Sequence, residues 1–147
     1  MRADGLVDSA LMLAAREKAN HRHHGILVTL DAWLRLNRWH EVFEQAGAID
    51  LGATSPNRKH CVIFEAKTIT AENELQQTRR AIGQLLEYRH VHGRKADRLC
   101  LVTDIALSRQ RAQLLDELGI AVLLAPVGAT SVTAQNLRAQ RILTSGR

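Results

Sequence analysis

Short apolar runs alternate with polar, turn-forming segments along the chain, and this pattern predicts a mixed α/β fold. Three runs of strand length follow one another at His40–Gln45, Ala48–Ala53 and His60–Ala66. The first alternates apolar and polar residues, whereas the third is almost continuously apolar, as in a strand buried on both faces. Turn formers fill residues 54–59, TSPNRK, and predict a hairpin between the second and third runs.

Helical spacing of apolar residues precedes and follows these strands. Residues 1–19 predict a short amphipathic helix, a polar break follows at 20–25, and a second helix is expected from about His24 to Asn37. A long helix is expected from about Ala71 to His92, capped by Thr70 or a neighbour and followed by Gly93. Its core stripe is expected to comprise Leu75, Ile82, Leu85 and Leu86.

The last third of the chain returns to strands. Residues 98–103 and 120–125 predict strands, and between them a helix capped by Ser108 runs to about Leu118 and ends at Gly119. The order α-α-β-β-β-α-β-α-β predicts an α/β fold with a mixed sheet of about five strands flanked by helices. We expect one domain over residues 1–147, with its core at about 24–125 and a basic tail or weak helix at 126–147.

Composition changes this picture mainly through charge. The net charge of +5 and the pI of about 9.9 favour a polyanionic partner, usually nucleic acid, although small basic domains are common. Cys61 and Cys100 lie in apolar runs and are expected to pack as small hydrophobes. The sequence shows neither a membrane-length apolar run nor a signal peptide, so we expect a soluble cytoplasmic protein that does not bind membranes.

Two carboxylates and a lysine mark the ends of neighbouring predicted strands. Asp50 lies in the second strand, and Glu65-Ala66-Lys67 ends the third. Asp50, Glu65 and the backbone carbonyl of Ala66 could hold Mg²⁺ or Mn²⁺, because a hard cation binds one or two carboxylates and retains several waters. Strand alternation sends Glu65 and Lys67 to one face, where a lysine could orient the attacking water and neutralise charge on phosphorus.

The alternative to a metal site is that these charged residues lie where the strands reach solvent and have no catalytic role. A Glu-x-Lys triplet occurs by chance in most proteins of this size. Two features of the surrounding sequence favour a site. Phe64 and the apolar run before it predict a buried strand, and the strand before it also carries a carboxylate, Asp50, within the reach of one hairpin.

Together these motifs resemble the PD-(D/E)xK nuclease superfamily. The resemblance rests on Ile49-Asp50-Leu51, on Glu65-Ala66-Lys67 and on Gln84-x-x-x-Tyr88, which is similar to the extra motif of RecB-like nucleases. Ile49 stands where the family name has proline. The resemblance implies a restriction-endonuclease-like core and Mg²⁺-dependent hydrolysis of phosphodiester bonds, with Asp50, Glu65 and Lys67 as the catalytic set. It also implies that Gln84 contacts the catalytic region or the DNA, supported by Tyr88.

Weaker candidates surround this set. His24, near the predicted start of the second helix, and Glu44 are further metal-ligand candidates; loop histidines and exposed strand residues are the alternative. Four residues are candidates for contact with DNA phosphates, although a solvated helix face explains the arginines nearly as well. They are Arg79, Arg80, Arg89 and Thr68.

The sequence thus predicts a metal-dependent deoxyribonuclease that acts as an endonuclease, in restriction, repair or phage defence. The alternative is a non-catalytic nucleic-acid-binding module, or an assembly subunit, with a nuclease-like fold. The expected partners are the DNA backbone, a second copy of the chain, and a partner protein or fused domain that supplies sequence specificity.

Overall fold

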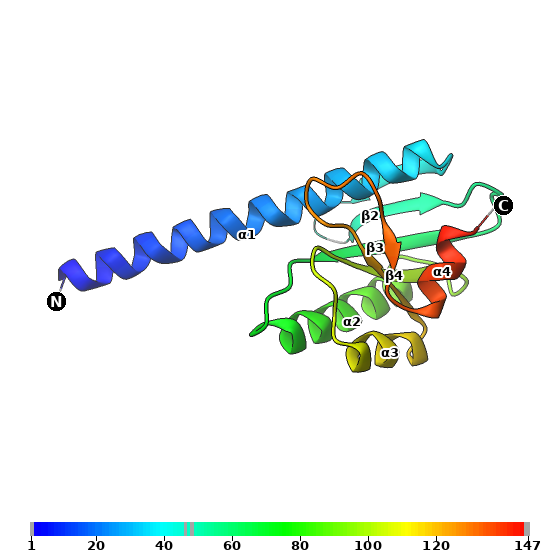
Figure 1. Ribbon diagram of the computed structural model, residues 1–147. Coiled ribbons are helices and arrows are strands. Elements are labelled where there is room, and N and C mark those ends of the chain that lie inside the picture. The colour runs from blue at the N-terminus through cyan, green and yellow to red at the C-terminus, as the bar shows by residue number, and fades with distance from the viewer. Residues whose placement is uncertain (1, 46, 48, 146–147) are drawn as a thin grey trace.

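A single mixed sheet forms the centre of the molecule, with helices on both faces (Figure 1). The computed structural model describes residues 2–45, 47 and 49–145, and for residues 2–9, 15, 16 and 19 it describes the backbone alone. Within these residues, six strands lie in the order β1-β2-β3-β4-β5-β6. The strands are β1 (His40–Gln45), β2 (Ile49–Thr54), β3 (Cys61–Lys67), β4 (Arg98–Thr103), β5 (Ile120–Leu124) and β6 (Thr133–Ala134).

Strand directions follow from the connections. β2 pairs antiparallel with both β1 and β3. The β3–β4 and β4–β5 pairs are parallel, because the helices α2 (Glu74–Val91) and α3 (Arg109–Glu117) carry the chain back between them. β6 closes the sheet as an antiparallel edge strand.

Each face of the sheet packs against two helices. Helices α1 (Arg2–Leu36) and α4 (Leu137–Leu143) cover one face, where Ile26, Leu30 and Phe64 are fully buried. Helices α2 and α3 cover the other face, where Leu85 and Leu115 are buried. The mixed α/β class and the helix-flanked mixed sheet predicted from the sequence are therefore confirmed.

The predicted strands and the two crossover helices are found within a few residues of their expected bounds. Ser108 caps α3 as predicted, because its hydroxyl accepts a hydrogen bond from the Arg111 amide. Gly119 follows that helix with a φ of +87°, a conformation that glycine adopts without strain. Ala48, the predicted first residue of the second strand, lies outside the described residues.

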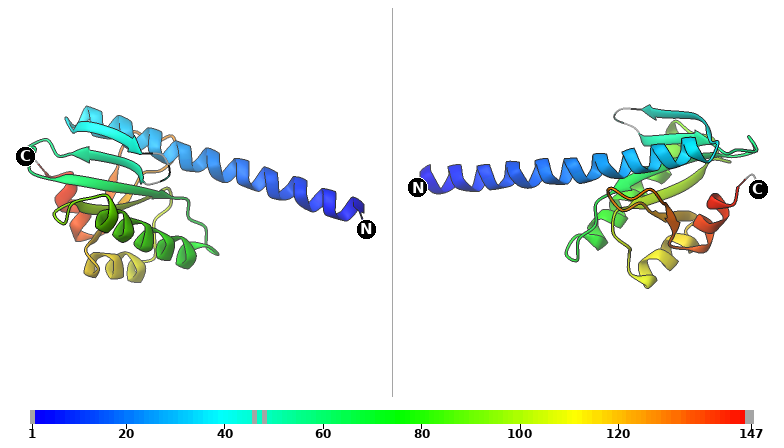
Figure 2. Two further views of the ribbon diagram at one scale, coloured as in Figure 1. Left: turned by 180° about the vertical axis from the view of Figure 1, so that it is seen from behind. Right: turned by 45° about the horizontal axis from the view of Figure 1, so that its top comes forward.

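The prediction of two N-terminal helices is wrong, because α1 is one continuous helix of 35 residues. The polar segment at 20–25 contains no proline, and its side chains lie on the helix surface rather than ending it. Gly25 has a packing role here: a Cβ at this position would lie 2.8 Å from Cγ1 of Val127. The first half of α1 projects beyond the sheet (Figure 2), and Leu11, Met12 and Leu13 are 58–65% exposed there. Met1 lies outside the described residues.

The C-terminal region is more ordered than the expected weak helix or linker. It supplies β6 and α4, and it buries Val132, Ala139 and Ile142 in the core on the α1 face. Asn136 fixes this region: its side chain caps α4 at the Ala139 amide and also accepts from the Val122 amide. Gly146 and Arg147, at the end of the predicted tail, lie outside the described residues.

The buried stripe of α2 also differs from the expected one. Thr78, Ala81, Leu85 and Tyr88 face the sheet, while Leu75 and Leu86 are 44% and 38% exposed. Small residues at the centre of the stripe let the helix lie close to β3 and β4. No helix in the described part of the chain is long and apolar enough to cross a membrane.

Candidate active site

Asp50 and Glu65 lie near each other on the neighbouring strands β2 and β3. The antiparallel register pairs Leu51 with Phe64, and Asp50 and Glu65 come next along the two strands. The Ala66 amide donates to Asp50 Oδ2 at 2.8 Å, and the charge of Asp50 contributes to the raised pKa of Glu65. The structure therefore places the two carboxylates close together.

Glu65 is a buried carboxyl group with an unusual protonation equilibrium. Its side chain is 8% exposed, and its Oε1 lies 3.3 Å from the Lys67 Nζ. Burial, together with the negative charge of Asp50, raises the pKa of Glu65 to about 7, and the opposing effect of Lys67 is smaller. At neutral pH this group exchanges readily between its acid and carboxylate forms.

Asp50 is held in its ionised form. Burial alone would raise its pKa, but its Oδ2 accepts hydrogen bonds from the His23 ring at 3.1 Å and from the Ala66 amide at 2.8 Å. These two donors outweigh the burial and lower the pKa of Asp50. Two carboxyl groups side by side therefore have pKa values that are displaced in opposite directions, a pattern typical of functional sites.

His23, on α1, is the third member of the site. The sequence prediction chose His24, but His24 is exposed, and it is His23 that meets Asp50. The reason is helical continuity: His23 lies three and seven residues before the buried Ile26 and Leu30, on the same helix face. The expectation of a helix break at this point concealed that spacing.

An ion pair that the sequence analysis did not single out holds α1 over the strand ends. The Nε of Arg22 donates to Asp104 Oδ2 at 2.9 Å, and its guanidinium also donates to the Ile69 carbonyl at 3.1 Å. The other oxygen of Asp104 accepts from the Ile69 amide at 2.9 Å. Because Arg22 directly precedes His23 on α1, this network holds α1 in the position at which His23 hydrogen-bonds Asp50.

Gln84 and Tyr88 lie on the side of α2 that faces β1 and the β1–β2 turn. The Tyr88 hydroxyl donates to Gln45 Oε1 at 3.1 Å, so it ties α2 to the end of β1. The Gln77 side chain donates to the Thr68 carbonyl, so these two residues lie at the same level of α2 and β3. Seven residues of helix and three residues of strand both cover about 10 Å, which places the exposed Gln84 at about the level of Glu65. Contact of Gln84 with the substrate stays a prediction.

The remaining candidates are spread more widely. Glu44 is exposed on the edge strand β1, and Arg79 and Arg80 are exposed on the outer side of α2. Thr68 is buried directly after Lys67, where its carbonyl accepts hydrogen bonds from Asn73 and Gln77. Arg89 lies at the far end of α2, where it donates to the Asp97 carbonyl. The roles of these residues in metal or DNA binding stay predictions.

The donor set at Asp50 and Glu65 suits a hard divalent cation. Among the described residues, no group of three or more His, Cys, Asp and Glu side chains is arranged to hold a metal ion. Magnesium commonly uses only one or two carboxylates, with water completing its shell. Burial, and after it the charge of Asp50, raises the pKa of Glu65, and a bound cation would offset both effects. The Ala66 amide, rather than its carbonyl, meets Asp50 here, so the carbonyl's role as a ligand stays a prediction.

No family model, curated protein or solved structure matches this chain. Its own residues and their resemblance to a known motif set are therefore what indicates its function.

We expect the pKa of His23 to lie above its ordinary value of 6.5, because the hydrogen bond to Asp50 and the nearby charge of Glu65 stabilise the imidazolium. Asp50→Asn removes the largest of these effects, and the pKa of His23 should then fall. NMR titration of the histidine ring resonances measures both values, with His24→Gln as a control that assigns the neighbouring ring. An unchanged His23 pKa in Asp50→Asn would contradict the geometry.

Proposed function

We propose that this protein is a metal-dependent nuclease that hydrolyses phosphodiester bonds of DNA, with a restriction-endonuclease-like core. The single observation that carries the proposal is the proximity of Asp50 and Glu65 on β2 and β3, with Lys67 beside Glu65. The order of α1, β1, β2, β3, α2 and β4 supports it, since this is the order that the motif resemblance implies. Endonuclease action is the form we favour.

Each residue of the site has a role set by its charge. Asp50 stays ionised at neutral pH, because His23 and the Ala66 amide hydrogen-bond its carboxylate. Glu65 loses its proton when a positive charge approaches, so its raised pKa couples cation binding to proton release. Lys67, 13% exposed, can donate to a non-bridging phosphate oxygen or orient the attacking water.

Asp50 and Glu65 would hold Mg²⁺ or Mn²⁺, which when bound would polarise the phosphate and lower the pKa of water. His23 holds the Asp50 carboxylate in place through its hydrogen bond. It is a positioning residue in this arrangement, because its contact is with Asp50 rather than with the substrate. Gln84, on α2, and the exposed Arg80 one turn before it are the residues that we propose to contact the DNA.

A plasmid-cleavage assay with Mg²⁺ or Mn²⁺ tests this proposal. We expect Lys67→Ala to slow cleavage by about 10²-fold or more, because it removes the cation that offsets charge at phosphorus. Lys59→Ala is the matched control: Lys59 is exposed in the β2–β3 turn, and its loss should leave the rate within about twofold. If the wild type and Lys67→Ala leave plasmid, linear DNA and RNA equally intact, the nuclease proposal fails and the non-catalytic alternative gains support.

A further inference from the structure

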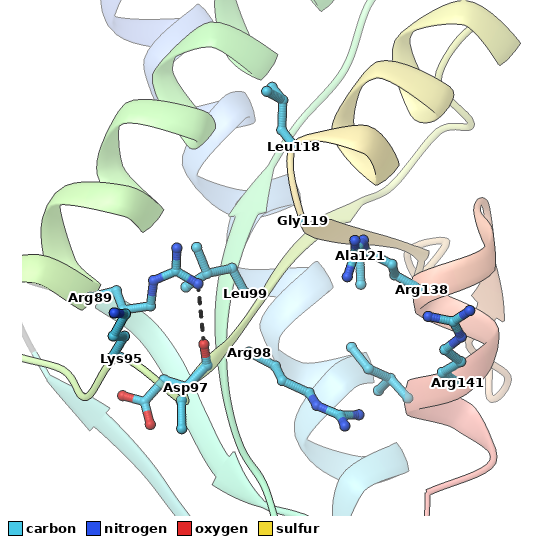
Figure 3. Close-up of a pocket in the computed structure, with 12 residues that line it drawn as sticks. Arg89, Lys95, Asp97, Arg98, Leu99, Leu118, Gly119, Ala121, Arg138 and Arg141 are labelled. Carbon is cyan, nitrogen blue, oxygen red and sulfur yellow. Dashed lines mark hydrogen bonds between the residues drawn. The ribbon is translucent and has the colours of Figure 1, made fainter.

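A hollow lined by basic side chains lies at the opposite end of the parallel strands (Figure 3). It forms where β4 and β5 begin, between the end of α2 and helix α4, and its volume is about 330 Å³. Five cationic residues line it against one acid, Asp97. The cationic residues are Arg89, Lys95, Arg98, Arg138 and Arg141.

None of these five cations forms an ion pair with a carboxylate among the described residues. Three of them hydrogen-bond neutral groups instead: Arg89 the Asp97 carbonyl, Arg98 the His60 ring and Arg138 the Asp116 carbonyl. The Asp97 carboxylate is engaged by the Arg94 amide at 2.7 Å. The hollow therefore carries an excess of positive charge, with five cations against one carboxylate in its lining.

The fold gathers these cations from α2, β4, α4 and the loop between α2 and β4. Figure 3 shows Arg89 and Lys95 on one side of the start of β4, with Arg138 and Arg141 on the other side. Arg138 and Arg141 are three residues apart on α4, which places them on neighbouring positions of one helix surface. Gathering like charges is unfavourable by itself, so an anion in the hollow would stabilise the arrangement.

We propose that this hollow is a binding site for a phosphate-bearing ligand. Arginine presents a planar fork of N–H donors that matches phosphate oxygens, and four of the five cations are arginines. The volume is at the lower end of the range for small-ligand sites, which suits a group of nucleotide size. Leu99, Leu118 and Ile142 add an apolar wall for the remainder of the ligand.

This site is separate from the carboxylate pair and does not depend on the proposed nuclease activity. In the parallel register Glu65 pairs with Leu101, so Arg98 lies three residues away, about 10 Å along the strand. The phosphate could belong to a free nucleotide or to a nucleic acid whose backbone reaches this end of the sheet. Both sources offer the same group to the arginines, and the choice of probe distinguishes them.

Calorimetric titration with pyrophosphate, adenosine monophosphate and a short DNA duplex, all at low salt without divalent metal, tests the proposal. The pocket variant is Lys95→Gln with Arg141→Gln, since neither side chain has a hydrogen-bond partner among the described residues and the fold should persist. The control is Arg38→Gln with Arg109→Gln, which removes the same charge from exposed positions elsewhere. A thermal melt verifies that both variants fold.

We expect the pocket variant to bind at least one probe about fivefold more weakly than the wild type, with the control within about twofold. Weaker binding of pyrophosphate or the nucleotide indicates a free ligand, whereas an effect confined to the duplex indicates a nucleic-acid backbone. The proposal is wrong if the wild type binds none of the three probes. It is equally wrong if the pocket variant binds every probe as tightly as the wild type does, or if both double variants weaken binding alike, since general charge would then explain the result.

Discussion

Glu65→Gln is expected to reduce DNA cleavage by about 10³-fold, equivalent to about 4 kcal/mol in the barrier. The substitution keeps the shape of the side chain and an oxygen that can still meet Lys67. It removes the negative charge with which Glu65 would hold a divalent cation opposite Asp50. Initial rates on plasmid DNA with Mg²⁺ measure this loss, and Glu44→Gln, on the exposed edge strand, is the matched control.

The same substitution is expected to stabilise the fold at high pH. The folded pKa of Glu65, about 7, exceeds the ordinary value of 4.5, so between these values the folded state binds more protons than the unfolded state. Wild-type stability therefore falls with rising pH across this window on account of Glu65, and the Gln variant lacks that fall. The free energy of unfolding of the variant, relative to the wild type, should rise by about 2 kcal/mol between pH 5 and pH 8.

Denaturant unfolding at several pH values measures that difference. Opposite effects on activity and stability distinguish a functional carboxylate from a structural one, because a residue that merely supports the fold would lower both. A difference in stability that stays constant with pH would contradict the raised pKa of Glu65. Retained cleavage by a correctly folded variant would instead remove Glu65 from the catalytic set.

Local sequence patterns predicted most of the sheet, because apolar runs and turn-forming residues indicate each strand and its ends without reference to distant parts of the chain. β3 is an uninterrupted apolar run, and the TSPNRK turn fixes which strand pairs with it. The proximity of Asp50 to Glu65 follows from that hairpin. The spacing along α2 was less informative: it placed Tyr88 with Gln84, away from the core stripe, whereas the structure buries Tyr88 on the face toward the sheet. Thr78 and Ala81 form the centre of that face, where larger residues were expected.

What the sequence could not predict depends on contacts between distant segments. α1 continues past residue 25, and Val127 packs where a side chain at Gly25 would lie. The choice of His23 over His24 follows from that continuity. The C-terminal residues 126–147 have weak periodicity by themselves, and their order comes from Asn136, whose side chain bonds backbone groups of β5 and α3. Such long-range hydrogen bonds leave no periodic signal.

Asp104→Ala is expected to destabilise the fold by about 2 to 3 kcal/mol. The Asp104 side chain is 4% exposed and accepts from Arg22 and from the Ile69 amide, so its removal leaves a buried N–H without a partner. The cost stays below that of a fully buried pair, because Arg22 is 27% exposed and regains water. Asp104→Asn keeps an acceptor for Ile69 and should cost about half as much.

Asp31→Ala is the matched control, because it also removes an aspartate paired with an arginine of α1. Arg35 and Asp31 are 63% and 39% exposed, and an exposed pair of this kind contributes less than about 0.5 kcal/mol. Urea unfolding with NMR titration of the histidines measures both consequences of losing Asp104. Since Arg22 precedes His23, Asp104→Ala should also weaken the His23 hydrogen bond to Asp50 and lower the pKa of His23. If Asp104→Ala and Asp31→Ala cost the same and His23 titrates unchanged, the Arg22–Asp104 pair does not position α1 over the site.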